Sequence, residues 1–236
     1  MKESVIVFCA HSDDQVLGVG GTIANYAKQG KKVKTVIFSY GELPLSSPIL
    51  LKEKHSIERR VKESQKADKI IGGSGVMFFG LVDTKVAQEI DEKDILSRMI
   101  KLIKDLKPKK IFTHNIDDPH PDHRAVRKAV VDVLYEMNYK CDVYAFQIYT
   151  PIKLRRRNVP KLVVDISDTF KIKIKALKAF RTQFNFYAFI NWIPLFSTFV
   201  RNFMNGINNN CRFAEVFYKI SLEEDTNGKE KSIDSK

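Results

Sequence analysis

Residues 5–22 read VIVFCAHSDDQVLGVGGT, and this stretch decides the fold. Its first five residues are apolar and rich in valine and isoleucine, which predicts a strand buried on both faces of a parallel sheet. One imidazole and two carboxylates follow within four positions, on His11, Asp13 and Asp14. Loops at the carboxyl ends of strands build the functional site of an open α/β sheet. The sequence therefore predicts a site at the end of this strand, and the density of ligand-type groups indicates a metal.

A second group of candidate ligands lies in residues 120–123, which read HPDH. Catalytic zinc sites combine three protein ligands, often histidines with a carboxylate, and leave the fourth position for water. His11, Asp14 and His123 would make such a set, because the i, i+3 spacing lets the first two face one point at the start of a helix. Asp13 would then face the water.

His114 is a competing ligand, since it ends the strand predicted over 110–114, just before the second group. A histidine in that position is more typical of a hydrogen-bonded residue in the core or at its rim. Both alternatives stay open at the level of the sequence.

Taken together, these motifs resemble the PIG-L or LmbE-like family of zinc-dependent N-acetylglucosaminyl deacetylases. The resemblance extends in order over residues 4–220 and implies hydrolysis of an acetamide to a free amino sugar and acetate. It rests on AHSDDQ at 10–15, GVGGT at 18–22, Arg60 with Glu63, FGLVD at 79–83, HPDHR at 120–124, KALKAFRTQ at 175–183 and AEVF at 214–217.

The resemblance agrees with a role for each polar residue of the site. Asp13 takes a proton from the attacking water and can pass it to the leaving amine. His120 stabilises the oxyanion or acts as an acid, and Asp122 orients His120. By the same resemblance, Arg60 and Asp83 match residues that bind the sugar.

Three residues depart from the family pattern. Ser12 stands where proline is usual, Gln15 where glutamate is usual, and Phe180 where a histidine is usual. None is a predicted ligand, so the zinc site should survive, but a missing carboxylate at Gln15 could weaken metal affinity. Arg60 could also form an ordinary surface charge pair with Glu63, which leaves its role open.

Periodicity along the chain predicts an α/β fold, with a Rossmann-like, mostly parallel sheet flanked by helices and the metal site at the C-terminal ends of the strands. One domain is expected over 1–221, followed by a disordered tail over 222–236. Further strands are predicted at 34–39, 76–81, 110–114, 141–150, 162–166 and 214–220; helices at 16–30, 56–71, 91–106, 122–138 and from an Asp168 cap to 183; and a loop at 41–54.

The glycines at 18, 20 and 21 do not indicate a dinucleotide site. Their pattern is GxGG rather than GxGxxG, and no lone acidic residue closes the second predicted strand. We expect them instead to let the first helix pack closely beneath the metal loop.

Net charge limits the partners that are expected, and cysteine content limits the expected cellular compartment. The chain carries 40 Lys and Arg against 28 Asp and Glu, a formal net charge of +12. This charge suits nucleic acid, an anionic membrane or a phosphorylated substrate, but the lysines are spread along the chain and only 153–157 is a dense patch, so nucleic acid is disfavoured. Three scattered cysteines and no secretory signal at the N-terminus predict a cytoplasmic protein without disulfides.

Residues 182–200 contain no charged residue. The stretch is close to the ~20 residues that span a bilayer, but its polar residues and Pro194 argue against spanning. Peripheral membrane contact through 184–204, on the cytoplasmic face, is one alternative, and a helical lid or a contact in a homo-oligomer is the other. The substrate is then a small-molecule or a lipid- or diphosphate-linked amino sugar, and a catalytically silent sugar-binding module that retains the metal is the competing function.

Overall fold

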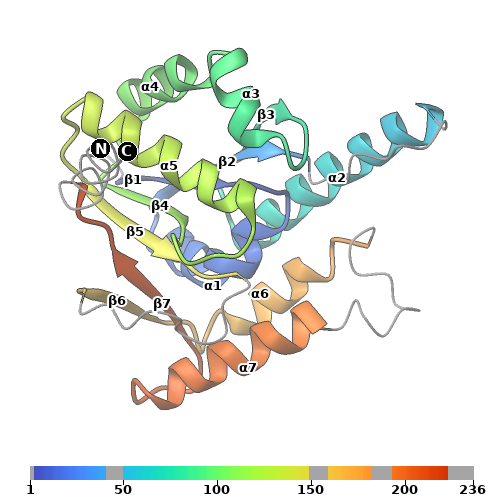
Figure 1. The fold of residues 1–236 in the computed structure, drawn as a ribbon. Coiled ribbons are helices and arrows are strands. Elements are labelled where there is room, and N and C mark those ends of the chain that lie inside the picture. The colour runs from blue at the N-terminus through green and yellow to red at the C-terminus, as the bar shows by residue number, and fades with distance from the viewer. Residues whose placement is uncertain (1–2, 41–49, 149–158, 182–192, 223–236) are drawn as a thin grey trace.

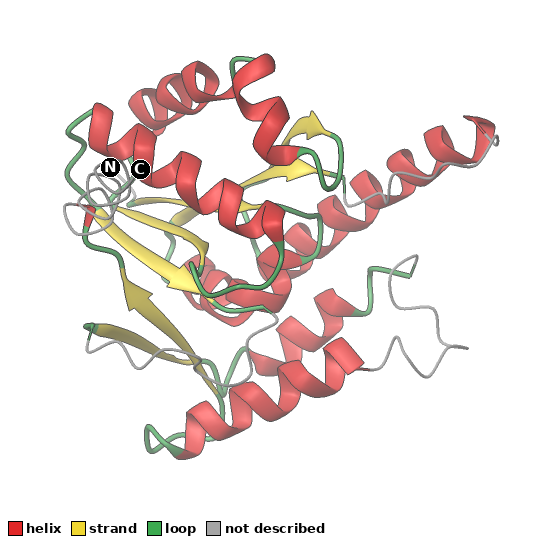
Figure 2. Ribbon diagram, in the orientation of Figure 1, coloured by secondary structure: helices red, strands yellow, loops and turns green. Residues whose placement is uncertain are grey.

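A computed structural model of the chain describes residues 3–40, 50–148, 159–181 and 193–222, and its architecture is that of the predicted α/β class (Figure 1). Figure 2 shows a central sheet with helices on both faces. In the described residues the sheet has seven strands in the order β3-β2-β1-β4-β5-β7-β6. These strands are β1 Ser4–Cys9, β2 Lys32–Ser39, β3 Val76–Leu81, β4 Lys110–His114, β5 Asp142–Phe146, β6 Lys161–Asp165 and β7 Ala214–Lys219.

Strand β1 lies at the centre of the sheet and pairs in parallel with both β2 and β4. The chain runs from β1 outward through β2 to β3, then returns to the other side of β1 to form β4 and β5. Connections diverge at the junction of β1 and β4, which is the topological switch point where α/β sheets bind ligands. Strands β7 and β6 complete the sheet in antiparallel orientation, so the prediction of a mostly parallel sheet is confirmed.

Alternate side chains of β1 enter two different core layers, as the pleat of a strand requires. Ile6 and Phe8 pack with α3, α4 and α5, whereas Val5, Val7 and Cys9 pack with α1, α2 and α6. Figure 1 shows α3, α4 and α5 above the sheet and α1 and α6 below it. The helices are α1 Asp14–Lys28, α2 Leu50–Ile71, α3 Val86–Glu92, α4 Ile95–Leu106, α5 Pro121–Glu136, α6 Phe170–Leu177 and α7 Ile193–Ile207.

Three sequence predictions about helices are wrong. The helix expected over 91–106 is two helices, because Asp94 takes a left-handed conformation at φ 49°. Helix α2 begins at Leu50, inside the loop expected over 41–54. Thr169, rather than Asp168, is the N-cap of α6, and this helix ends at Leu177 instead of continuing to 183. The predicted helix boundaries followed local sequence signals. Tertiary context overrides such signals, and the observed boundaries differ from them.

Close packing of α1 explains its glycines. A Cβ atom on Gly18 would lie 2.5 Å from Cδ2 of Phe146, and one on Gly21 would lie 2.7 Å from Cγ2 of Ile166. Real Cβ contacts are not this short, so side chains here would push α1 away from the sheet. The glycines thus allow close packing, as expected, but the neighbours are Phe146 of β5 and Ile166 after β6 rather than the metal loop.

A buried ion pair ties α1 to the C-terminal elements. Lys173 of α6 and Glu215 of β7 are 2.7 Å apart, and both are buried. The Glu215 carboxylate also accepts hydrogen bonds from the backbone N–H groups of Gly21 and Thr22, at 3.0 and 2.8 Å. The Lys173 ammonium donates to the carbonyl of Leu17 at 2.9 Å. Helix α6 and strand β7 are therefore fastened to the backbone of α1.

Several predicted features lie outside the described residues: the 41–49 part of the loop, the basic patch at 153–157, the 182–192 part of the uncharged stretch and the tail from 223 onward. Within the part of the chain that the structure describes, no helix combines the length and hydropathy that crossing a membrane requires.

Candidate metal centre

The first half of the site is the turn from β1 into α1. Asp14 is the first residue of α1, and its carboxylate accepts a hydrogen bond from the backbone N–H of His11 at 2.8 Å. Both side chains are buried, with exposed fractions of 7% for His11 and 1% for Asp14. The i, i+3 pair predicted from the sequence therefore faces one point.

The second half arrives from β4 and the start of α5. His123 Nε2 lies 3.2 Å from His11 Nδ1 and 3.6 Å from Asp14 Oδ1, and His11 Nδ1 lies 3.8 Å from Asp14 Oδ2. Ligand atoms arranged tetrahedrally at 2.0–2.1 Å from zinc are about 3.3–3.4 Å apart. The donor atoms of His11, Asp14 and His123 thus lie near zinc-ligand spacing, with the two histidines beside different oxygens of the Asp14 carboxylate. With one donor atom per residue, the groups within 4.8 Å join His123 either to Asp14 and His114 or to His11 and His120.

Asp118 is a residue of the site that the sequence analysis missed. Its Oδ1 lies 2.9 Å from His123 Nδ1 and accepts a hydrogen bond from the backbone N–H of His120 at 3.0 Å. A carboxylate on one ring nitrogen directs the other nitrogen of a histidine toward a metal. The available signal was an acidic residue just before a proline, in the loop that follows β4 and precedes HPDH.

The other nitrogen of His11 faces two carboxylates. His11 Nε2 lies 3.0 Å from Asp83 Oδ1 and 3.3 Å from Asp122 Oδ2, and Asp122 also accepts a hydrogen bond from the backbone N–H of Thr84 at 2.7 Å. Burial lowers the pKa of His11, but hydrogen bonds to Asp122 and Asp83 and the charge of Asp14 outweigh it and raise the pKa to about 10. The centre therefore strongly favours a positive charge.

His120 is held by backbone groups at the N-terminus of α5. Its Nδ1 accepts a hydrogen bond from the backbone N–H of Asp122 at 3.2 Å, as an N-cap. In the neutral ring, Nε2 then carries the proton and is a donor. Burial, with the charges of His11 and His123, lowers the pKa of His120 and favours this neutral form. Asp122 contacts His120 through this backbone N–H, whereas its carboxylate lies against His11 and Thr84.

His114 lies against the predicted ligand Asp14, with 3.2 Å between its Nε2 and Oδ2 of that carboxylate. Its Nε2 accepts a hydrogen bond from the backbone N–H of Ala10 at 2.9 Å, which occupies the lone pair that a metal would need. Burial and the charge of His123 lower its pKa to about 4. This geometry matches the hydrogen-bonded alternative, although His114, Asp14 and His123 also have donor atoms within 4.8 Å of one another.

Asp13 stands at the N-terminus of α1 beside these groups. Burial and the neighbouring Asp14 carboxylate raise its pKa to about 6. Arg60 of α2 donates to the carbonyl of Tyr40 at 3.5 Å, and its charge acts in the opposite direction on the pKa of Asp13. Arg60 is thus directed toward the side of the site where Asp13 lies.

The residues that depart from the family pattern do not displace the ligands. The side-chain amide of Gln15 donates to the carbonyl of Ser64 at 3.4 Å, and the Ser64 hydroxyl donates to the carbonyl of Ser12 at 2.7 Å. Phe180 is buried in the layer of α1, α2 and α6. All three substitutions lie around the site and leave His11, Asp14 and His123 converging.

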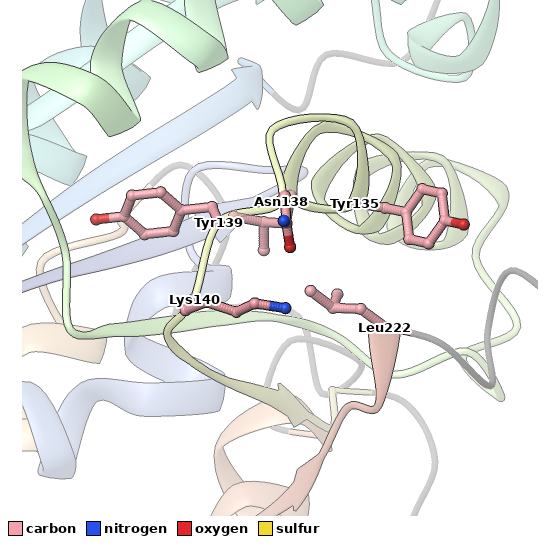
Figure 3. Close-up of a pocket in the computed structure, with 6 residues that line it drawn as sticks. Tyr135, Asn138, Tyr139, Lys140 and Leu222 are labelled. Atoms are coloured by element: carbon pink, nitrogen blue, oxygen red, sulfur yellow. The ribbon is translucent and has the colours of Figure 1, made fainter.

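A cavity of about 360 Å³ lies at the opposite end of α5 (Figure 3). In this view the side chain of Lys140 extends toward Leu222. Leu134, which lines the cavity, lies 11 positions after His123 on α5, and a rise of about 1.5 Å per residue separates the two by about 17 Å. It therefore contributes nothing to the centre around His123.

Residues 6–134 match the family described as PIG-L, GlcNAc-PI de-N-acetylase, over more than half of the chain. The chain belongs to the PIG-L family. Every predicted ligand lies inside the matched segment, as do Asp13, Asp83, His120 and Asp122. The resemblance identified from the sequence motifs is confirmed.

The proteins that the chain resembles are named for different enzyme activities. The chain is 32% identical over 192 residues to the probable N-acetyl-alpha-D-glucosaminyl L-malate deacetylase 2 of Bacillus subtilis, covering 78% of this chain and 84% of the relative. It is 26% identical over 210 residues to the 4-oxalmesaconate hydratase of Pseudomonas putida, covering 82% and 79%. The N,N'-diacetylchitobiose deacetylase of Pyrococcus horikoshii has the same fold, with a TM-score of 0.74, 20% identity and coverage of 93% and 84%.

Proposed function

We propose that the chain is a zinc-dependent hydrolase that removes the acetyl group from an N-acetylglucosamine-type sugar and produces a free amino sugar and acetate. The observation that carries the proposal is the convergence of His11 Nδ1, His123 Nε2 and the Asp14 carboxylate at 3.2–3.8 Å beside Asp13. The name of the Bacillus subtilis relative, a deacetylase of an N-acetylglucosaminyl compound, supports the substrate class.

His11, Asp14 and His123 would hold the zinc ion, a set of two nitrogens and one oxygen that suits zinc. When bound, zinc lowers the pKa of a coordinated water toward neutrality and polarises the acetamide carbonyl. Asp118 keeps His123 turned toward the ion, and Asp83 with Asp122 does the same for His11.

Asp13 is the general base in this proposal. It accepts the proton of the attacking water and passes it to the amine that leaves the acetyl group. Its place at the N-cap of α1, directly before Asp14, supports this role. A base of this kind works best when its pKa lies near the operating pH.

His120 stabilises the oxyanion that develops on the acetamide oxygen. The hydrogen bond from Asp122 to Nδ1 leaves a proton on Nε2, which can donate to that oxygen. Because the donor is fixed by the N-terminus of α5, it is in place before the reaction begins. Asp122 is a positioning residue here, through its backbone.

The sugar and its carrier form the finer part of the proposal. Arg60 and Asp83 would bind the sugar, although the Asp83 carboxylate also contacts His11. We propose a small-molecule or a lipid- or diphosphate-linked sugar and action in the cytoplasm, at the membrane surface for a lipid carrier. Of the membrane contact expected through 184–204, residues 184–192 lie outside the described part of the chain; the remainder is in α7.

The test combines metal content with acetate release. We expect about one zinc per chain in the purified protein, lost in His123→Ala and Asp14→Ala and kept in His55→Ala, a histidine outside the predicted ligand set. Acetate release is measured with N-acetylglucosaminyl malate and N,N'-diacetylchitobiose. No bound metal after incubation with zinc would contradict the hydrolase. Bound zinc without acetate release favours the silent sugar-binding module, and hydration of 4-oxalmesaconate would replace deacetylation by the reaction named for the Pseudomonas putida relative.

A further inference from the structure

Helix α7 reverses the orientation of an ordinary amphipathic helix, because its polar side faces the protein and its apolar side faces outward. Its inward face is polar: Thr198 and Asn202 have exposed fractions of only 1% and 2%, and the Asn202 amide donates to the carbonyl of Ala214 at 3.1 Å. Arg201 donates to the carbonyls of Ile148 and Leu17 at 2.7 and 3.0 Å. These hydrogen bonds fix the rotation of the helix, so the apolar side must face outward.

The outward face is a continuous apolar stripe. Six of the ten large apolar side chains that are exposed among the described residues lie on α7, at the spacing i, i+3, i+4, i+7, i+8 and i+11 of a single helix face. We call them the α7 stripe: Phe196, Phe199, Val200, Phe203, Met204 and Ile207, with exposed fractions of 68, 43, 38, 38, 50 and 54%.

The stripe has a rigid base. The rings of Phe170 and Phe213 stack with centroids 3.8 Å apart, and Phe199 contacts both, at 5.8 and 5.5 Å. Phe203 also contacts Phe213, at 6.0 Å. Figure 1 shows α7 along the lower edge of the molecule, on the far side from α3, α4 and α5. An exposed, ordered apolar face of this kind marks a contact surface.

The charge of the residues around α7 indicates which partner covers the α7 stripe. Residues 169–214 contain seven Lys and Arg and not one Asp or Glu. Five of the seven are exposed: Lys171, Lys175, Lys178, Arg181 and Arg212. A symmetric contact with a second copy would bring two such basic segments together, and like charges repel. An anionic lipid surface complements them, at about 1 kcal/mol per basic residue near the surface.

We infer that α7 is an interfacial helix that docks the protein on an anionic lipid surface, with the α7 stripe among the acyl chains and the basic residues at the headgroups. Arg201 links α7 to the carbonyl of Leu17, three residues after Asp14 on α1. The docked face is therefore fastened to the helix that begins at the metal centre. If the proposed deacetylation also holds, the substrate is a sugar on a lipid carrier presented from that surface.

The docking is tested by co-sedimentation with vesicles of phosphatidylcholine alone or with about one third phosphatidylglycerol. We expect binding to the anionic vesicles, and a loss of affinity of at least about tenfold in the double variant Phe196→Glu, Met204→Glu. Tyr135→Glu is the matched control, because Tyr135 is a helical aromatic residue with an exposed fraction of 56% that lies on α5. It should bind as the wild type does.

A second arm tests the charges: Lys175→Gln and Lys178→Gln should each weaken binding to anionic vesicles about fivefold. Equal binding to pure phosphatidylcholine, or no binding to either vesicle, would overturn the inference. A dimer in light scattering that dissociates in the Phe196→Glu, Met204→Glu variant would assign the stripe to a second copy instead. Vesicle binding needs no sugar, so an Asp13→Asn protein that still binds vesicles separates a failure of the proposed function from a failure of docking.

Discussion

The part of the chain over residues 3–148 and the part over 159–222 follow different rules. The first is built from parallel strands, and it holds every predicted ligand between His11 and His123. The second adds the antiparallel strands β6 and β7 and the helices α6 and α7. The family match ends at residue 134, before the second part begins.

The first part therefore holds the groups of the proposed chemistry, whereas the second part supports helix α1 and carries the proposed docking surface. In the first part, histidines and carboxylates are buried because they converge on one centre. In the second part, buried charges such as Lys173 and Glu215 are paired with each other and with the backbone of α1, and apolar residues are left outside on α7. Substitutions in one part should therefore change properties that substitutions in the other part leave intact.

The largest effect is expected at the base of the proposed reaction. Asp13→Asn should lower kcat about a thousandfold or more, because the attacking water loses its proton acceptor, within the range of 10²–10⁴ for general bases. Zinc content and thermal stability should stay near those of the wild type, as checked by metal analysis and a melting curve. Unchanged turnover would remove Asp13 from the mechanism, and absence of turnover in both proteins would favour the silent binding module.

A comparable change in free energy is expected in the part over residues 159–222. Lys173→Met leaves Glu215 without its cation and should reduce the free energy of unfolding by about 3–5 kcal/mol, measured by urea denaturation. Lys175→Met is the matched control, because Lys175 is exposed two positions further along α6. The folded variant should still bind one zinc. A change below about 1 kcal/mol would show that the pair does not fasten α1.

A smaller effect is expected at the residue that directs His123. Asp118→Asn keeps the shape but removes the charge beside His123 Nδ1, so zinc affinity should fall about 10–100-fold. Competition with a chelator measures this, and Asp105→Asn on the exposed face of α4 controls for the lost charge. Equal zinc affinity in both variants would contradict the orienting role of Asp118.

The smallest effect concerns pH and lies in the first part, on a helix that carries no predicted ligand. Asp68 on α2 is buried, and burial raises its pKa to about 6. A pKa raised in the folded state stabilises the fold below the unfolded value of about 3.9, and this contribution is lost as the pH rises through about 6. Asp68→Asn should therefore increase the unfolding free energy by about 2 kcal/mol at pH 7 and by almost nothing at pH 4. Asp91→Asn, on an exposed position of α3, should show no such trend, and a constant difference across pH would refute the assignment.

Sequence patterns predicted several strands well. β1, β3 and β4 were placed within a residue, since a run of apolar residues ended by polar ones leaves little choice. Helix ends were less predictable. The break at Asp94 has no strong local signal, because aspartate occurs both in helices and at left-handed positions, and only the structure shows that Asp94 takes the left-handed conformation at φ 49°.

At the site, the sequence predicted His11, Asp14 and His123 as ligands because their chemical types and their spacing are local properties of two short motifs, and the ligand set itself stays a prediction. The Asp83 carboxylate was not expected against His11, because that contact joins residues from different strand ends. Asp118 was missed although it lies only five positions before His123, because the conformation of the loop after β4 decides whether its carboxylate reaches the ring. Which lone pair of His114 is free depended on the backbone of Ala10, more than a hundred positions away.

By itself, then, the sequence determined the class of fold, the family and the residues that can hold a metal, because hydrophobic periodicity and short motifs act over a few residues. Only the tertiary structure decided how the carboxylates share the histidines, how Lys173 and Glu215 hold α1, and which side of α7 faces outward. The composition of α7 is compatible with a buried helix. Long-range hydrogen bonds from Arg201 and Asn202 to distant carbonyls turn its polar side inward, and no local pattern contains those partners.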